Sequence, residues 1–252
     1  MIPNESTYNK FFAHYYDELY KKNDYPLQIK NLITIFQKYT ILRSSKIIDI
    51  GCGTGEHAIH LSQGGYTVHG IDPSPSMIEK ALEKKKYNNV SFSCEYANTV
   101  SLKYDGAYSL FNVVNCLQNT TELTSFFDDI SNLLTEKSCF VFEAWNAERV
   151  LAEPPIAKQD ILYCGDKTIS RHVIPTLNKQ KTTVKLVYNY TIDSSTETVI
   201  HFIKLFTKSE LHTAFTLAGF KLQEVFPSLN TYHLSKPPTP EHRNTTYVLT
   251  KN

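Results

Sequence analysis

One stretch organises this sequence of 252 residues: Ile47-Ile48-Asp49-Ile50-Gly51-Cys52-Gly53-Thr54-Gly55-Glu56. Apolar, β-branched residues lead into three glycines, and the apolar residues after them, from Ala58 to Leu61, recur at helical spacing. The stretch therefore predicts a strand, a tight turn and a helix. Glycine lets a backbone bend sharply and approach a ligand closely, and the first amides of a helix are unpaired donors. Such a turn is typical of nucleotide binding.

A second predicted strand, residues 66–71, ends at Asp72, twenty-one positions after Gly51. A carboxylate at this place can accept hydrogen bonds from both hydroxyls of a ribose. An ordinary dinucleotide site is the first alternative, but the third glycine comes one residue early and Glu56 takes the sixth position of the motif. A pyrophosphate there would face a carboxylate. Asp49, ahead of the glycines, instead favours a ligand with an ammonium group, such as S-adenosylmethionine.

Two segments, Asp49 to Gly55 and Gly70-Ile71-Asp72-Pro73-Ser74-Pro75-Ser76-Met77, resemble motif I and the segment after it in the class I S-adenosylmethionine-dependent methyltransferases. The resemblance implies that S-adenosyl-L-methionine is the cofactor. It also implies which residues of these segments bind it, with Met77 against the adenine: Asp49, Gly51, Cys52, Gly53, Gly55, Asp72, Pro73 and Met77.

Residues 8–42 carry two helical patterns of apolar and aromatic residues ahead of the first core strand. Within them, the run from Tyr16 to Tyr20 and the pair Asp24-Tyr25 resemble the Tyr-Asp and Asp-Tyr elements that cover the cofactor in amino-sugar methyltransferases. A tyrosine suits a sulfonium because a cation is attracted to π density and its polarised methyl group can point at an oxygen. Tyr16 and Tyr25 are therefore expected to contact the cofactor, and Tyr16 also to act in catalysis.

The third predicted strand, residues 90–94, ends at Glu95-Tyr96-Ala97, where the resembled family usually has Gly-Asp-Ala. Tyr96 thus replaces the carboxylate that would accept a hydrogen bond from the adenine amino group. Tyr96 and Ala97 are still expected to border the cofactor. The backbone amide of Ala97 is the one contact of the resembled family that does not depend on the replaced carboxylate.

A fourth predicted strand, residues 107–113, leads into Val114-Asn115-Cys116-Leu117, which resembles the segment under the methyl group. In this region we expect Phe111 at the cofactor, Asn112 at the substrate and Asn115 in catalysis. Amino-methylating enzymes that act on DNA carry an Asn/Asp/Ser-Pro-Pro-aromatic sequence here, which this chain lacks. A nucleic-acid substrate is therefore not expected.

Strands and helices alternate up to Trp145, which favours a doubly wound parallel sheet. Four strand patterns then follow without a helix between them, at residues 160–164, 167–177, 183–192 and 198–206. The expected fold class is α/β, a mostly parallel, seven-stranded, Rossmann-like methyltransferase sheet with an N-terminal helical cover and an antiparallel β insertion. One domain is expected, made of the cover (1–44), the cofactor-binding core (45–149), the insertion over the active site (150–206), and the last helix and strands (207–252).

The whole layout resembles the N-methyltransferases of nucleotide-linked amino sugars. The matches include Phe142-Glu143-Ala144-Trp145, and the histidine that lies beside the acceptor nitrogen in the best-known members is replaced by Cys116. The resemblance implies a small, nucleotide-linked or phosphorylated acceptor, most simply a sugar amine in surface-polysaccharide or secondary-metabolite biosynthesis. The residues expected to contact it are Asn112, Trp145, Arg171, His201, His233 and Arg243.

Three kinds of acceptor remain open, and each needs different side chains. An amine needs only orientation and loss of a proton, because the sulfonium leaves as a neutral thioether. A hydroxyl needs a general base, for which His201 and His233 are the candidates. An anionic oxygen, as in a phosphoramidate, needs cations such as Arg171 and Arg243 to hold it.

Composition excludes several other classes of function. The formal net charge is +1, which gives no electrostatic footprint for nucleic acid or for a membrane surface. Five scattered cysteines, without Cys-x-x-Cys spacing, indicate neither a disulfide framework nor a metal site. With no apolar run of membrane-spanning length and no leader pattern, we expect a cytoplasmic monomer or homodimer. A non-catalytic S-adenosylmethionine-binding protein is the alternative from another class.

Overall fold

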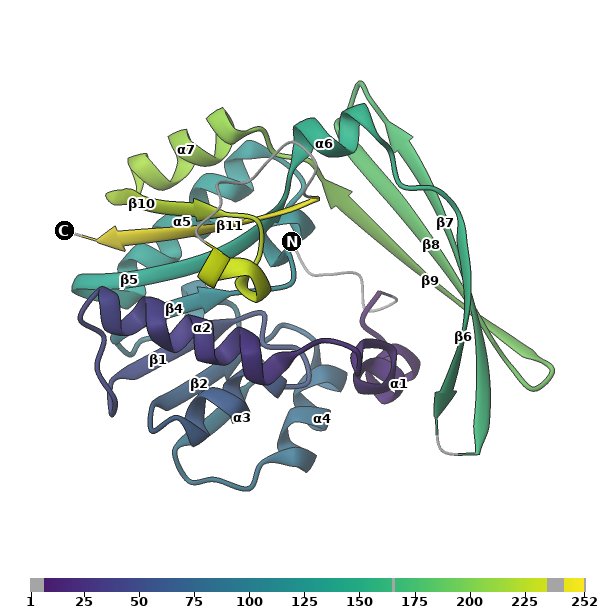
Figure 1. Cartoon of the computed structure of the whole chain (residues 1–252), viewed down its shortest axis with the longest axis horizontal. Coiled ribbons are helices and arrows are strands. Elements are labelled where there is room, and N and C mark those ends of the chain that lie inside the picture. Colours follow the sequence, from purple (N-terminus) through teal and green to yellow (C-terminus); the bar gives the residue numbers. More distant parts are fainter. Residues whose placement is uncertain (1–6, 165, 235–242, 252) are drawn as a thin grey trace.

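A seven-stranded sheet forms the centre of the structure, a computed structural model that describes residues 7–164, 166–234 and 243–251 (Figure 1). The strand order is β10-β11-β5-β4-β1-β2-β3; β11 is antiparallel to both neighbours, and the other pairs are parallel. The expected mostly parallel methyltransferase sheet is confirmed. Its strands are β1 (Lys46–Ile50), β2 (Thr67–Ile71), β3 (Val90–Ser93), β4 (Tyr104–Ser109), β5 (Leu134–Trp145), β10 (Phe220–Phe226) and β11 (Asn244–Lys251).

Helices cover both faces of this sheet. Ile47 of β1 is buried in one core cluster together with the apolar side chains of α2 and α3, whereas Ile48 is buried in a second cluster with those of α5 and α7. Because both faces are covered, successive residues of β1 are buried, which explains its unbroken apolar sequence. The helices are α2 (Tyr25–Lys38), α3 (Glu56–Gln63), α4 (Pro75–Lys84), α5 (Thr120–Leu133) and α7 (Lys208–Leu217).

A second, four-stranded antiparallel sheet follows the short helix α6 (Ala147–Ala152). Figure 1 shows helix α1 (Lys10–Tyr20) between this sheet and the core. Phe12 and Leu19 of α1 are buried in one cluster with Ile169 and Tyr190 of the second sheet, so the insertion is held on the N-terminal cover. The strands are β6 (Lys158–Cys164), β7 (Lys167–Asn178), β8 (Thr183–Ile192) and β9 (Ser195–Lys204).

The end of the fourth strand differs from the prediction. Strand β4 ends at Ser109, and the stretch to residue 113 was wrongly expected to continue it. Phe111 and Asn112 have φ angles of +57° and +63°, so the backbone turns in the left-handed region instead of remaining extended. The chain then enters the short 3₁₀ helix η2 (Val113–Cys116). This turn leads from the end of β4 to Val113 and Cys116, which line the cavity described below.

Two further 3₁₀ helices are η1 (Ala97–Thr99) and η3 (Leu229–Leu234). In the described ranges, none of the helices has the length and apolarity that a membrane crossing requires.

Candidate active site

The glycine turn after β1 leaves room for a ligand. Gly51 and Gly53 have φ angles of +75° and +54°. A Cβ atom on Gly51 would lie 2.6 Å from Cγ2 of Val113, so glycine is needed there for the close packing of η2. A Cβ atom on Gly53 would meet only Cε1 of Tyr16, at 4.0 Å. The backbone at Gly53 is therefore open on the side that faces helix α1.

Asp49 is a buried carboxyl group without a hydrogen-bond partner for one oxygen. Its side chain is 3% exposed, and Oδ2 has no partner among the described residues. Burial raises the pKa of Asp49 to about 8, and the nearby charge of Asp72 acts in the same direction. The buried hydroxyl of Tyr108, opposite Asp49 in the sheet register, lies outside hydrogen-bond geometry but close enough to favour the charged form of Asp49 and so limits the rise of its pKa. A cation beside Asp49 would offset the cost of burying this carboxylate.

Asp72 lies at the end of β2, beside the glycine turn. Its Oδ2 accepts a hydrogen bond from the amide of Gly53 at 3.0 Å, and its Oδ1 accepts one from the amide of Ser74 at 2.9 Å. Burial raises its pKa to about 6, although both hydrogen bonds favour the charged form. Each carboxylate oxygen has a second lone pair, so two ligand hydroxyls can still be accepted.

Aromatic side chains from α1 and α2 cover this region. The ring centroids of Tyr16 and Tyr20 are 4.6 Å apart, and those of Tyr25 and Phe111 are 5.9 Å apart. Burial raises the pKa of Tyr16 well above its ordinary value and that of Tyr25 to about 12, so both phenols are neutral at pH 7. The hydroxyl of Tyr25 is buried and makes no hydrogen bond of good geometry in the described part of the chain, although the side chain of Asn23 is near enough to limit the rise of its pKa. The cover thus presents π surface and an available hydroxyl.

Glu143 supports the turn after β4, a role that the sequence did not reveal. The side chain is 4% exposed, and its Oε2 accepts a hydrogen bond from the amide of Phe111 at 3.0 Å. Its Oε1 accepts one from the hydroxyl of Thr246 at 3.4 Å, and burial raises the pKa of Glu143. An acidic residue within the apolar strand Phe140 to Trp145 was the available signal, because a buried carboxyl group requires hydrogen-bond donors. The neighbouring Asn112 has a buried Oδ1 that is unpaired among the described residues.

A cavity of about 570 Å³ opens beside the glycine turn. Five of the residues that the sequence predicted near the cofactor or the acceptor line this cavity. Those that line it are Gly51, Pro73, Tyr96, Ala97 and His201; Tyr8, Cys116, Leu117 and several residues of α5 complete the wall. The cavity therefore joins the ends of β1, β2 and β3 to the N-terminal segment and to β9.

One end of the cavity carries three neutral polar groups. His201 is 9% exposed, its Nε2 has no partner among the described residues, and burial lowers its pKa to about 4. The ring of Tyr8 lies edge-on to that of His201, with centroids 5.1 Å apart. The Tyr8 hydroxyl contacts Sγ of Cys116 at 3.6 Å, and burial raises the pKa of both groups. Tyr8 was missed because an isolated tyrosine near the N-terminus carries no sequence signal.

Several predicted site residues have other partners. Both polar ends of Asn115 bond to backbone, since Nδ2 donates to the Lys204 carbonyl at 2.6 Å and Oδ1 accepts from the Trp145 amide at 2.8 Å. Asn115 is therefore held by two backbone groups, but one N–H and one oxygen lone pair remain, so its expected catalytic role stays a prediction. Arg171 donates hydrogen bonds to Asp160 through Nε and Nη2 at 2.8 and 2.7 Å, so one edge of its guanidinium group is already paired.

Four other predicted residues do not line the cavity, or their side chains lie outside the described part of the structure. Met77 is 1% exposed and packs in the cluster of α1, and the side chain of Cys52 packs in the core below the turn. Met77 does not line the cavity, and neither does Asp49 or Asp72, so the contact of Met77 with adenine stays a prediction. Arg243 is exposed and lies over the ring of Trp145 at 5.9 Å. The side chain of His233 lies outside the described residues.

A family model described as a methyltransferase domain matches residues 41–219, which include the glycine turn, most of the cavity wall and the second sheet. The chain belongs to this methyltransferase domain family. This membership agrees with the glycine turn, whose sequence resembles the S-adenosylmethionine site of the class I methyltransferases.

Individual relatives are more distant. A relative from Geobacillus sp. (strain WCH70) is 28% identical over 136 residues, and the match spans 52% of this methyltransferase and 55% of that protein, about half of each. The dTDP-3-amino-3,4,6-trideoxy-alpha-D-glucopyranose N,N-dimethyltransferase of Streptomyces venezuelae is 22% identical over 84% of this chain and 90% of its own. The crystal structure of an S-adenosylmethionine-dependent methyltransferase from Clostridium acetobutylicum superposes with a TM-score of 0.80 at 16% identity, covering 96% of this chain and 98% of that one. This last likeness shows a shared fold.

The residues present fit the cofactor of this methyltransferase. The unpaired, buried carboxyl group of Asp49 suits the ammonium group of the cofactor, and the open backbone at Gly53 leaves space for a ligand under Tyr16. The two free lone pairs of Asp72 suit ribose hydroxyls.

Proposed function

We propose that this methyltransferase transfers the methyl group of S-adenosylmethionine to the nitrogen of a small, nucleotide-linked amino sugar, in the biosynthesis of a surface polysaccharide or a secondary metabolite. The observation that carries the proposal is the end of the cavity at Tyr8, Cys116 and His201, whose three polar groups are uncharged at pH 7. The similarity of the chain, over most of its length, to a dimethyltransferase of a dTDP-linked amino sugar supports it.

Four residues hold the cofactor in this proposal. Asp49, in its ionised form, binds the ammonium group, and Asp72 accepts the two ribose hydroxyls. Tyr16 and Tyr25 cover the sulfonium end, exclude water and present π surface to the positive charge. When bound, S-adenosylmethionine supplies an electrophilic methyl group and leaves as a neutral thioether. The protein therefore needs to position the acceptor in line with the methyl group.

The acceptor end favours an amine in its neutral form. Burial away from water disfavours an ammonium ion, so an amine that enters this end of the cavity sheds a proton and exposes its lone pair. His201 is uncharged at neutral pH, because its pKa is lowered to about 4, and its unpaired Nε2 can accept a hydrogen bond from the remaining N–H of the amine. The Tyr8 hydroxyl can donate a hydrogen bond to a neighbouring sugar oxygen.

A hydroxyl acceptor is the second candidate, and His201 is the observation that favours it. An unpaired, neutral imidazole is able to remove a hydroxyl proton as the oxygen attacks the methyl group. An anionic acceptor oxygen, as in a phosphoramidate, has less support. The cavity wall carries no lysine or arginine among the described residues, and Arg171 is bound to Asp160.

Methyl transfer to matched acceptors tests the proposal. The purified enzyme is incubated with labelled S-adenosylmethionine and either dTDP-3-amino-3,6-dideoxyglucose or the same sugar nucleotide with a 3-hydroxyl group. We expect methylation of the amine, a rate that rises with pH through the pKa of the bound amine, and a loss of less than about tenfold in His201→Ala. Methylation of the hydroxyl compound alone, with a loss of about 100-fold or more in His201→Ala, would establish the second candidate instead.

A further inference from the structure

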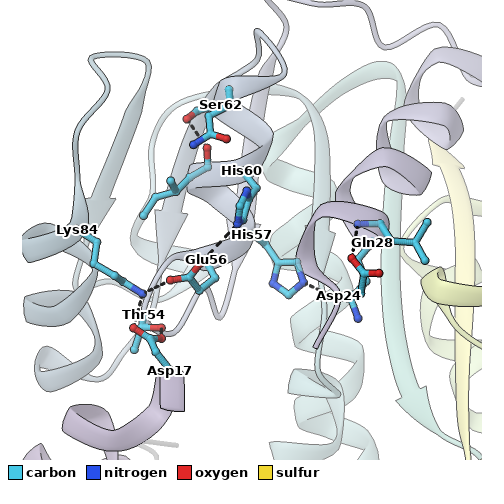
Figure 2. Close-up of polar contacts among 12 residues, drawn as sticks. Asp17, Asp24, Gln28, Thr54, Glu56, His57, His60, Ser62 and Lys84 are labelled. Carbon is cyan, nitrogen blue, oxygen red and sulfur yellow. Dashed lines mark hydrogen bonds and ion pairs between the residues drawn. The ribbon is translucent and has the colours of Figure 1, made fainter. Parts of the chain in front are cut away.

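Behind the glycine turn, a set of polar side chains joins four separate elements (Figure 2). Thr54 Oγ1 donates a hydrogen bond to Asp17 Oδ1 at 2.5 Å. Lys84 Nζ donates to Asp17 Oδ2 at 2.7 Å and to Glu56 Oε1 at 2.6 Å. Asp17 belongs to α1, Thr54 to the glycine turn, Glu56 to α3 and Lys84 to α4. These four residues are called the clasp below.

The clasp lies directly beside the predicted cofactor cover. Asp17 follows Tyr16 on α1, and Thr54 follows Gly53 in the turn. Tyr16 and Gly53 face each other, as the 4.0 Å separation from a Cβ placed on Gly53 shows. The hydrogen bond between Asp17 and Thr54 therefore joins the residues that follow these two facing groups. Thr54 is only 1% exposed. A movement of α1 away from the turn would break this bond and leave the buried Thr54 hydroxyl unpaired.

Charge makes Lys84 the central member of the clasp. It lies between the carboxylates of Asp17 and Glu56, and His60 is a further group that faces Glu56, at 3.7 Å. Each ion pair is partly exposed and by itself contributes little, because water screens it. Removal of Lys84, however, leaves two carboxylates on α1 and α3 close together without a cation. Their repulsion pushes α1 and α3 apart, and α3 follows directly on the glycine turn.

We propose that Asp17, Thr54 and Lys84 are positioning residues that hold Tyr16 over the sulfonium end of S-adenosylmethionine. The ligand is the cofactor of the enzyme, and the inference uses the covering role proposed for Tyr16. The clasp keeps the cover in place before the cofactor binds, so less ordering of α1 is needed on binding. The acceptor has no part in this step.

Cofactor affinity in the absence of any acceptor tests the clasp. The dissociation constant of S-adenosylmethionine is measured by calorimetry for Lys84→Met, Asp17→Asn and Glu56→Gln. We expect losses of about tenfold, about threefold and less than about twofold in that order, since only the first leaves opposed carboxylates and the last leaves Lys84 paired with Asp17. The losses should shrink at 0.5 M salt, at which the Debye length is about 4 Å.

Lys80→Met is the matched control. Lys80 lies on the same helix, its side chain is 28% exposed compared with 27% for Lys84, and its partner is Glu83 of α4 itself. It should change the affinity by less than about twofold, because its ion pair does not reach α1. Equal losses in Lys80→Met and Lys84→Met would overturn the proposal.

The same substitution made in a Tyr16→Ala protein separates an effect on the position of Tyr16 from a general loss of stability. If the clasp acts through Tyr16, then Lys84→Met should cause almost no further loss of affinity in a Tyr16→Ala protein. Undiminished loss there would refute the inference even if the order of the single variants were as expected. Lys84→Arg, which keeps the charge, should restore most of the affinity, and melting curves verify that each variant is folded. Because no amino sugar is used, failure of the proposed acceptor does not affect these results.

Discussion

The proton balance of cofactor binding is the sharpest consequence of the buried carboxyl group of Asp49. With a pKa of about 8, Asp49 is about 90% protonated in the free enzyme at pH 7. An ammonium group beside it favours the ionised form, so binding at pH 7 should release about 0.9 proton. Calorimetry in buffers with different ionisation enthalpies measures this number directly. A release close to zero would refute the assignment of Asp49 as the partner of the ammonium group.

The same linkage sets the pH dependence of affinity. Below pH 8 the ionised fraction of Asp49 rises about tenfold per pH unit, so the affinity for S-adenosylmethionine should rise about tenfold between pH 6 and pH 7. Asp72, with a pKa of about 6, adds at most about a factor of two over this range. Asp49→Asn should bind weakly and retain only that smaller factor. An unchanged tenfold slope in Asp49→Asn would show that another group titrates.

Stability should respond to Asp49→Asn in the opposite direction from affinity. The folded protein binds the Asp49 proton more tightly than the unfolded chain does, because the pKa is raised from 3.8 to about 8. The free enzyme therefore loses stability as pH rises from about 4 to about 8, and the loss is complete above the folded pKa. Asparagine does not ionise, so the cofactor-free variant should melt at a higher temperature than the wild type at pH 8. A lower melting temperature would indicate that the carboxylate has a cationic partner within the protein.

Three other predictions concern single side chains. Asp72→Ala should weaken cofactor binding by about 2 kcal/mol, the cost of losing charge-assisted hydrogen bonds, and unchanged calorimetric affinity in a folded variant would remove Asp72 from the site. Tyr16→Phe should reduce turnover with little change in melting temperature, whereas the reverse result would make Tyr16 a packing residue. Tyr8→Phe should reduce turnover of the amino-sugar acceptor about tenfold while cofactor affinity stays constant, because only a weak contact with a thiol is lost within the protein. Tyr15→Phe is the control. It removes the hydroxyl of a buried tyrosine of the N-terminal cover and should leave turnover unchanged.

Local patterns were sufficient for the fold and for the cofactor turn. Alternation of strands and helices, the apolar run of β1 and the spacing between Gly51 and Asp72 all act within short segments, where periodicity and backbone geometry decide the outcome. The antiparallel insertion was equally visible, because the side chains of β8 alternate between apolar and polar. Strand β4 was extended too far, since Phe111 and Asn112 adopt left-handed backbone conformations with the support of Glu143, which is distant in the sequence.

The sequence by itself determined that this chain folds as a doubly wound methyltransferase sheet, and it predicted that the glycine turn and Asp72 lie side by side at the ends of neighbouring strands. The tertiary structure alone decided which polar side chains are available. Asn115 and Arg171 looked suited to chemistry, but each bonds to another segment of the chain, while Asp49 and His201 keep buried atoms that are unpaired within the described residues. The cavity end at Tyr8 and the clasp at Asp17 and Lys84 join residues from distant segments. Whether a polar group is free depends on what packs against it in three dimensions, and no local pattern in a sequence contains that information.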